Sequence, residues 1–99
     1  MYATATIPQE ALAQICRRYQ VSELALFGSA LRADFQPESD LDVLVTFEPG
    51  TRVGFLTLAR LARELSDLLG RKVDLVPKDG LKPLLRNEIL SHTEVLFAA

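Results

Sequence analysis

The chain has 99 residues, of which 48% are hydrophobic and 24% charged, and its formal net charge is −2. This composition is typical of one ordinary globular domain, residues 1–99, and disfavours a protein that binds nucleic acid through its overall charge. The sequence contains no apolar run long enough to span a membrane and shows no signal peptide, and the single Cys16 fits a reducing compartment. We therefore expect a cytoplasmic protein without membrane binding or direct nucleic-acid binding.

The first predicted element is a helix that ends at about Gln20. Thr6-Ile7-Pro8-Gln9 resembles a capping box, in which the Thr6 hydroxyl would cap the helix. Its apolar side chains share one face at helical spacing: Leu12, Ile15, Cys16 and Tyr19. Cys16 is therefore predicted to be a core residue, because a reactive cysteine needs an exposed electropositive setting.

Val21 to Phe27 is the first predicted strand, and Gly28-Ser29 ends it. Backbone N–H groups at the start of a short helix over residues 30–33 could bind an anion, because they lack hydrogen-bond partners. Gly28 would let the backbone approach a phosphate closely, Ser29 adds a hydroxyl donor, and Arg32 could reach the same phosphates. A Gly-Ser pair alone most often marks an ordinary turn.

Ten residues separate Ser29 from Asp40, and Asp40-x-Asp42 opens a second predicted strand, Leu41 to Phe47. Alternate residues of a strand point to the same face, so the two carboxylates lie side by side. Because burying two unpaired acids would cost on the order of several kcal/mol, we expect a cation between them. Oxygen ligands suit Mg²⁺ or Mn²⁺. The alternative is a strand whose first outward residues are simply solvated.

A long helix is predicted from about Val53 to Leu69, with Gly70 placed to end it. Its predicted buried face consists of Phe55, Leu58, Leu61, Ala62, Leu65 and Leu69, and its outward face of Arg60, Arg63, Glu64 and Asp67.

The strand Lys72 to Pro77 follows and carries Asp74 in its middle. The order strand, helix, strand favours parallel pairing with residues 41–47, which would bring Asp74 beside Asp40 and Asp42.

A turn leads to a last helix, Pro83 to about Ser91, with Leu84, Leu85, Ile89 and Leu90 predicted to face inward. Glu94 to Phe97 is predicted as a final edge strand. The expected fold class is therefore α/β (α+β), a small mixed β-sheet with helices packed on one side.

Gly28-Ser29, ten residues, and then Asp40-x-Asp42 resemble the signature of the minimal nucleotidyltransferase (MNT) family of the DNA polymerase beta nucleotidyltransferase superfamily. The likeness covers nearly the whole chain, and Arg32 matches the basic residue that commonly follows the Gly-Ser turn. Ala33 departs from the glycine often found next, and Ala30 replaces a frequent arginine. These departures leave the details of phosphate contact open.

The resemblance implies two Mg²⁺ or Mn²⁺ ions between three carboxylates and the triphosphate of ATP or another NTP. Asp40 and Asp42 would bridge the ions, and Asp74 would bind the ion nearer the nucleophile and help to remove its proton.

It also implies that Gly28, Ser29 and Arg32 hold the β- and γ-phosphates. The expected function is therefore metal-dependent transfer of an NMP, AMP from ATP, onto a hydroxyl of a partner protein, with release of pyrophosphate. The family resemblance makes that partner a helical HEPN toxin and this chain the antitoxin, which would silence the toxin by AMPylation of a tyrosine.

Two alternatives remain. The chain could mask its partner by contact without chemistry, although three clustered acids disfavour a pure binding module. It could instead modify a small molecule or a nucleic acid, although a short chain with neither an acceptor domain nor a basic stripe disfavours this. The sequence also leaves the base of the NTP, the acceptor and a homo-oligomer open.

Overall fold

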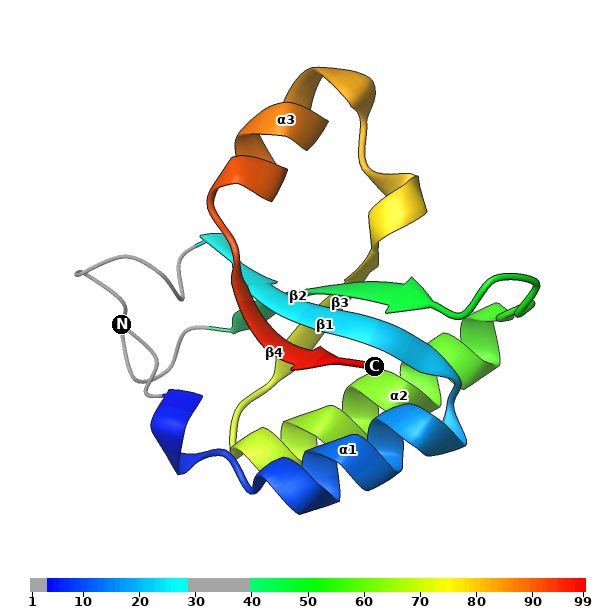
Figure 1. Cartoon of the computed structure of the whole chain (residues 1–99), viewed down its shortest axis with the longest axis vertical. Coiled ribbons are helices and arrows are strands. Elements are labelled where there is room, and N and C mark those ends of the chain that lie inside the picture. The colour runs from blue at the N-terminus through cyan, green and yellow to red at the C-terminus, as the bar shows by residue number, and fades with distance from the viewer. Residues whose placement is uncertain (1–3, 29–39) are drawn as a thin grey trace.

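The computed structural model describes residues 4–28 and 40–99, and these ranges contain a four-stranded sheet and three α-helices (Figure 1). The label η marks a short 3-10 helix. The elements in chain order are η1 (Thr4–Thr6), α1 (Gln9–Arg18), β1 (Val21–Phe27), β2 (Leu41–Phe47), α2 (Phe55–Leu69), β3 (Val73–Pro77), η3 (Lys78–Gly80), α3 (Pro83–Ser91) and β4 (Glu94–Ala98). None of the helices in these ranges has the length and apolar character needed to cross a membrane.

The sheet has the strand order β3-β2-β1-β4, so β3 and β4 are its edges. β1 runs antiparallel to both β2 and β4, whereas β2 and β3 are parallel. The parallel pair follows from the chain order, because α2 carries the chain back before β3 begins. The mixed sheet, the parallel pair and the edge position of the last strand are all confirmed.

The hydrophobic core lies between the sheet and the two helices α1 and α2, which lie side by side across one face (Figure 1). Alternate residues of β1 and β2 point into this layer, as the two-residue period of a strand requires. The largest fully buried side chains from these helices and strands are Leu12, Cys16, Leu24, Leu26, Leu41, Val43, Val45, Leu61 and Leu65. The prediction that Cys16 belongs to the core is therefore confirmed.

The sequence predicted the C-terminal end of α2 correctly but not the N-terminal cap of α1. Gly70 ends α2 in the left-handed conformation (φ 71°), as predicted, and its N–H donates to the Ser66 carbonyl. The capping box at α1 is wrong. The N-cap residue is Pro8, with no side-chain hydrogen bond, because Thr6 belongs to the separate turn η1.

The predicted inward face of α3 is also wrong. α3 has no buried residue, and the side chains of Leu84 and Leu85 are 95% and 49% exposed. Figure 1 shows the reason, since α3 lies on the far side of the sheet from α1 and α2 and stands away from it. Phe55 is 82% exposed as well, because it is the first residue of α2 and the helix packs against the core only from Leu58 onward.

Candidate active site

Asp42 and Asp74 are neighbours across the parallel pair of strands. Each is the second residue of its strand, and the register pairs Asp42 with Asp74 directly. Register partners point to the same side of a sheet. Because Leu41, Val43 and Val73 face the helices α1 and α2, both carboxylates lie on the opposite face. Asp42 is partly exposed and Asp74 exposed, so a solvent-borne ligand can reach them.

Gly28 lies against the Asp42 side chain, on the side of β2 that faces β1. Phe27, the last residue of β1, pairs with Asp42, so the chain reaches Gly28 immediately beside the carboxylate. Gly28 has φ 69°, in the left-handed region that favours glycine. A Cβ added here would clash with Asp42 Oδ2 and would lie 3.3 Å from Asp42 Cγ. Glycine is therefore required both for the turn and for the close approach of the backbone to an acid.

Asp40 lies one position before β2, with its side chain about half exposed. The N–H of Leu41 donates to the carbonyl of Lys72 at 2.9 Å, which continues the β2–β3 ladder to this end of the strands. The Lys72 ammonium nitrogen lies 4.0 Å from Asp40 Oδ2. Lys72 was not among the residues that the sequence motif singled out. The sequence feature that could have identified Lys72 is its position two residues before Asp74, because residues two apart in a strand lie on the same face.

The donor set at this end of the sheet fits a hard divalent cation in its chemistry. Asp40, Asp42 and Asp74 are oxygen donors at the starts of two adjacent strands, and the Lys72 ammonium already brings a positive charge to one of them. Within residues 4–28 and 40–99, however, no three His, Cys, Asp or Glu side chains converge closely enough to hold a metal ion. The metal-binding role of the three aspartates therefore stays a prediction.

Two of the predicted phosphate ligands, Ser29 and Arg32, lie outside the described residues, as do Ala30 and Ala33. Their roles likewise stay predictions. Of the predicted phosphate site, the structure describes Gly28, which it places against Asp42.

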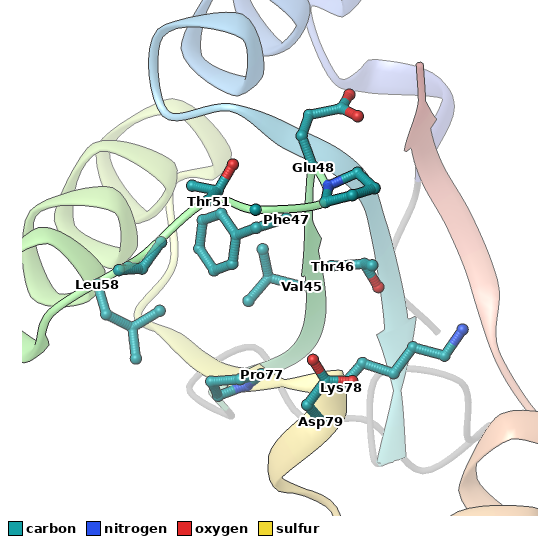
Figure 2. Close-up of a pocket in the computed structure, with 12 residues that line it drawn as sticks. Val45, Thr46, Phe47, Glu48, Thr51, Leu58, Pro77, Lys78 and Asp79 are labelled. Carbon is teal, nitrogen blue, oxygen red and sulfur yellow. The ribbon is translucent and has the colours of Figure 1, made fainter.

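A pocket of about 310 Å³ lies at the other end of the same strands. It is lined by Val45 to Thr51, Val53, Leu58 and residues 77–79, which include the last residues of β2 and β3. Figure 2 shows the side chains of Val45, Phe47 and Leu58 grouped in this pocket, with the Glu48 carboxylate pointing away. Asp42 and Asp74 stand at the opposite strand ends. The pocket is thus separate from the acidic site.

Cys16 and Tyr19 have shifted pKa values, but neither belongs to this site. Burial raises the pKa of the Cys16 thiol to about 12, so the thiol stays protonated and is not a nucleophile. The hydrogen bond to Glu64 raises the pKa of the Tyr19 hydroxyl, with burial adding to the effect. Both groups support the packing of the helices.

Comparison with known proteins identifies the domain. A family model described as a nucleotidyltransferase domain matches residues 9–96. Protein adenylyltransferase MntA of Thermococcus cleftensis is 36% identical over 77 residues, which are 78% of this chain and 76% of MntA.

Solved structures of similar proteins also point to the nucleotidyltransferase domain. One described as a "putative minimal nucleotidyltransferase" is 39% identical with a TM-score of 0.72, covering 91% of this chain and 90% of its own. A second, the MNT antitoxin in complex with a tri-AMPylated HEPN toxin of Shewanella oneidensis, has a TM-score of 0.64 and covers 92% and 70%. At 19% identity, this second likeness shows the shared fold alone.

Proposed function

The chain belongs to the nucleotidyltransferase domain family and is a nucleotidyltransferase, and on this premise we propose that it transfers AMP from ATP to a hydroxyl of a partner protein. The observation that carries the proposal is the position of Asp42, with Asp74 beside it on one strand and Gly28 against it on the other. An acid that can bind a metal and a turn that can bind a phosphate thus meet at one point. The name of the relative MntA, a protein adenylyltransferase, supports AMP as the transferred group and a protein as the acceptor.

In the proposed reaction, the acceptor hydroxyl oxygen forms a bond to the α-phosphorus of ATP. The bond between that phosphorus and the oxygen bridging to the β-phosphate breaks, and pyrophosphate leaves. Two Mg²⁺ or Mn²⁺ ions held by Asp40, Asp42 and Asp74 would supply charge compensation and lower the pKa of the attacking hydroxyl. Asp74, on the exposed edge strand β3, would accept the hydroxyl proton.

The triphosphate would be held at the turn that follows β1. The left-handed conformation at Gly28 turns the chain immediately beside Asp42, so phosphates bound there would lie next to the acids. Ser29 would donate its hydroxyl to the β- or γ-phosphate and Arg32 its guanidinium. The parts played by Ser29 and Arg32 rest on the sequence motif.

The proposed partner is a HEPN-type toxin, which would make this chain the antitoxin of a toxin–antitoxin pair. Support comes from the resemblance of Gly28-Ser29 and Asp40-x-Asp42 to the MNT signature and from the fold shared with the MNT antitoxin that was solved in complex with the Shewanella oneidensis HEPN toxin. The acceptor would then be a tyrosine hydroxyl of the toxin. Transfer of AMP would add a bulky anionic group to that tyrosine.

The test is transfer of labelled AMP from ATP to a co-purified partner by wild type and by Asp42→Asn. Asparagine keeps the size of the side chain but removes a charge that the metal ions need. If that charge supplies about 4 kcal/mol at the transition state, the rate falls about a thousandfold. The matched control is Asp67→Asn on the outer face of α2, which makes the same change away from the site and should leave the rate unchanged. Full transfer by Asp42→Asn would refute the metal-binding role of Asp42.

A second candidate is a module that masks its partner by contact alone. The observation that favours it is the set of large apolar side chains that the fold leaves exposed: Phe55, Leu56, Leu84, Leu85 and Val95. Where such side chains gather on one surface, they mark a protein-binding site. Neutralisation of the partner by wild type and Asp42→Asn alike, without AMP transfer by either, would select this candidate over the enzyme.

A further inference from the structure

Lys72 stands at the acidic end of the β2–β3 pair, where the structure places a cation beside an acid. The register pairs Leu41 with Val73 and Asp42 with Asp74, and the Leu41 N–H donates to the Lys72 carbonyl as part of the Leu41–Val73 pair. Asp40 and Lys72 are the residues that precede this first pair on the two strands. Lys72 therefore stands across from Asp40. The ammonium nitrogen of Lys72 lies 4.0 Å from Asp40 Oδ2.

Fold stability does not explain this ion pair. The side chains of Lys72 and Asp40 are 79% and 49% exposed, and ion pairs at such positions contribute little to folding. A lysine ammonium is a compact charge on a flexible stem, so it can approach a carboxylate and leave again at small cost. Lys72 also precedes Asp74 by two residues, which by the two-residue period of a strand puts it on the face that carries the acids.

We propose that Lys72 is a positioning residue that balances the charge of Asp40 while no divalent ion is bound and withdraws when one binds. The inference rests on the metal site of the proposed function and adds to it a residue that sets how tightly that site holds metal. Lys72 would weaken metal binding in two ways. Its ammonium competes for the Asp40 carboxylate, and its positive charge repels the incoming cation.

The experiment measures Mn²⁺ affinity without nucleotide, from the electron paramagnetic resonance signal of free Mn²⁺, for wild type and Lys72→Met. Methionine keeps an unbranched side chain and removes the charge. We expect about three- to tenfold tighter binding by Lys72→Met at low ionic strength, and a difference that shrinks as added salt screens the charges. Lys72→Arg keeps the charge and should bind Mn²⁺ within about twofold of wild type.

The matched control is Lys82→Met. Lys82 is exposed at the start of α3, and its replacement changes the net charge of the chain by the same amount. It should leave Mn²⁺ affinity within about twofold of wild type, because a charge that interacts with the acids only across water has a weak effect on them even at low ionic strength. The melting temperatures of both variants without metal should stay within about 2 °C of wild type, which shows that the fold is unaffected.

Unchanged or weaker Mn²⁺ binding by Lys72→Met, with wild type binding normally, would overturn the role of Lys72 and leave the proposed function standing. If that variant instead loses affinity for an ATP analogue at unchanged Mn²⁺ affinity, Lys72 is a phosphate ligand and the inference is wrong. If wild type binds no Mn²⁺ even with the analogue present, the metal site of the proposed function fails, and the inference fails with it.

Discussion

Gly28 is the residue on which the arrangement of the site depends most directly. Its left-handed conformation turns the chain at the end of β1, and its missing side chain leaves the space that the Asp42 carboxylate occupies. The two requirements are separable, because other glycines of the chain share only the first. Gly50 has φ 81°, yet a Cβ added there would meet nothing within 4 Å.

Gly28→Ala is therefore expected to lower AMP transfer at least about tenfold, since a displacement of Asp42 of about an ångström would disturb the proposed geometry. Gly50→Ala is the control. Both variants carry a left-handed alanine, which costs about 1–2 kcal/mol, but Gly50→Ala leaves Asp42 in place. Transfer rates measured beside urea unfolding separate the clash from the backbone strain. Equal losses of transfer in both variants would contradict the assigned role of Gly28.

At the scale of elements, α1 and α2 are joined by polar contacts as well as by the core. The Tyr19 hydroxyl, at the end of α1, donates to the Glu64 carboxylate in the middle of α2. Arg18 Nη1 lies 2.5 Å from Glu64 Oε1. Glu64 was predicted to point outward to solvent. Its side chain instead takes part in both contacts and is only 31% exposed.

Tyr19→Phe should therefore lower the free energy of unfolding by about 1 kcal/mol, because it removes one hydrogen bond to a charged acceptor and keeps the ring. Arg18→Met should cost less, since the Arg18 side chain is 60% exposed and its ion pair is screened by water. Chemical denaturation measures both values. AMP transfer should be unchanged in Tyr19→Phe, and a large loss of transfer would show that the helix pair affects the acidic site.

The helix α3 carries an apolar side chain that its own chain does not cover. Leu84→Ser should leave the stability of the free protein within about 0.5 kcal/mol of wild type, because Leu84 is 95% exposed. Affinity for the proposed partner should fall about tenfold or more if this side chain is buried in the complex. Calorimetric titration against the partner tests this, with Ser91→Ala near the exposed end of α3 as the control. Unchanged affinity for Leu84→Ser would place the interface elsewhere.

At the scale of the whole molecule, Cys16 links global stability to pH. The thiol is fully buried in the folded chain, and this burial raises its pKa from an ordinary value of 9.0 to about 12. A folded pKa above the unfolded pKa means that the folded state holds the proton more tightly. The contribution of Cys16 is therefore complete below pH 9 and is lost as pH rises from 9 toward 12.

The free energy of unfolding should accordingly fall by up to about 1.4 kcal/mol per pH unit above pH 9 through this group alone. Cys16→Ala should reduce that slope, even though the variant is less stable near pH 8 because it leaves a cavity. Urea unfolding of both proteins between pH 8 and 11 measures the two slopes. The hydrogen bond to Glu64 raises the pKa of Tyr19 in both proteins, so the contribution of Tyr19 cancels in the comparison. Parallel slopes would show that the Cys16 thiol does not control alkaline stability.

Much of the architecture could be predicted from local patterns. The strand boundaries agree with the sequence to within one residue, and the end of α2 at Gly70 and the burial of Cys16 agree as well. Alternation, helical spacing and a left-handed glycine all act over a few residues. The same spacing failed for α3 and for Phe55. Periodicity shows which side chains share a face of a helix, but not whether another element covers that face.

For the acidic site too, the sequence predicted the local features, and the tertiary structure decided the contacts between strands. The order of residues alone was enough to place Asp40 and Asp42 on one strand face and to indicate that β3 runs parallel to β2, since both follow from the period of a strand and the length of the connection. Only the tertiary structure decided that Asp74 pairs with Asp42, that Gly28 closes on the Asp42 carboxylate and that Lys72 faces Asp40. These positions depend on the register between strands far apart in the chain, and a shift of one residue would turn every side chain to the other face.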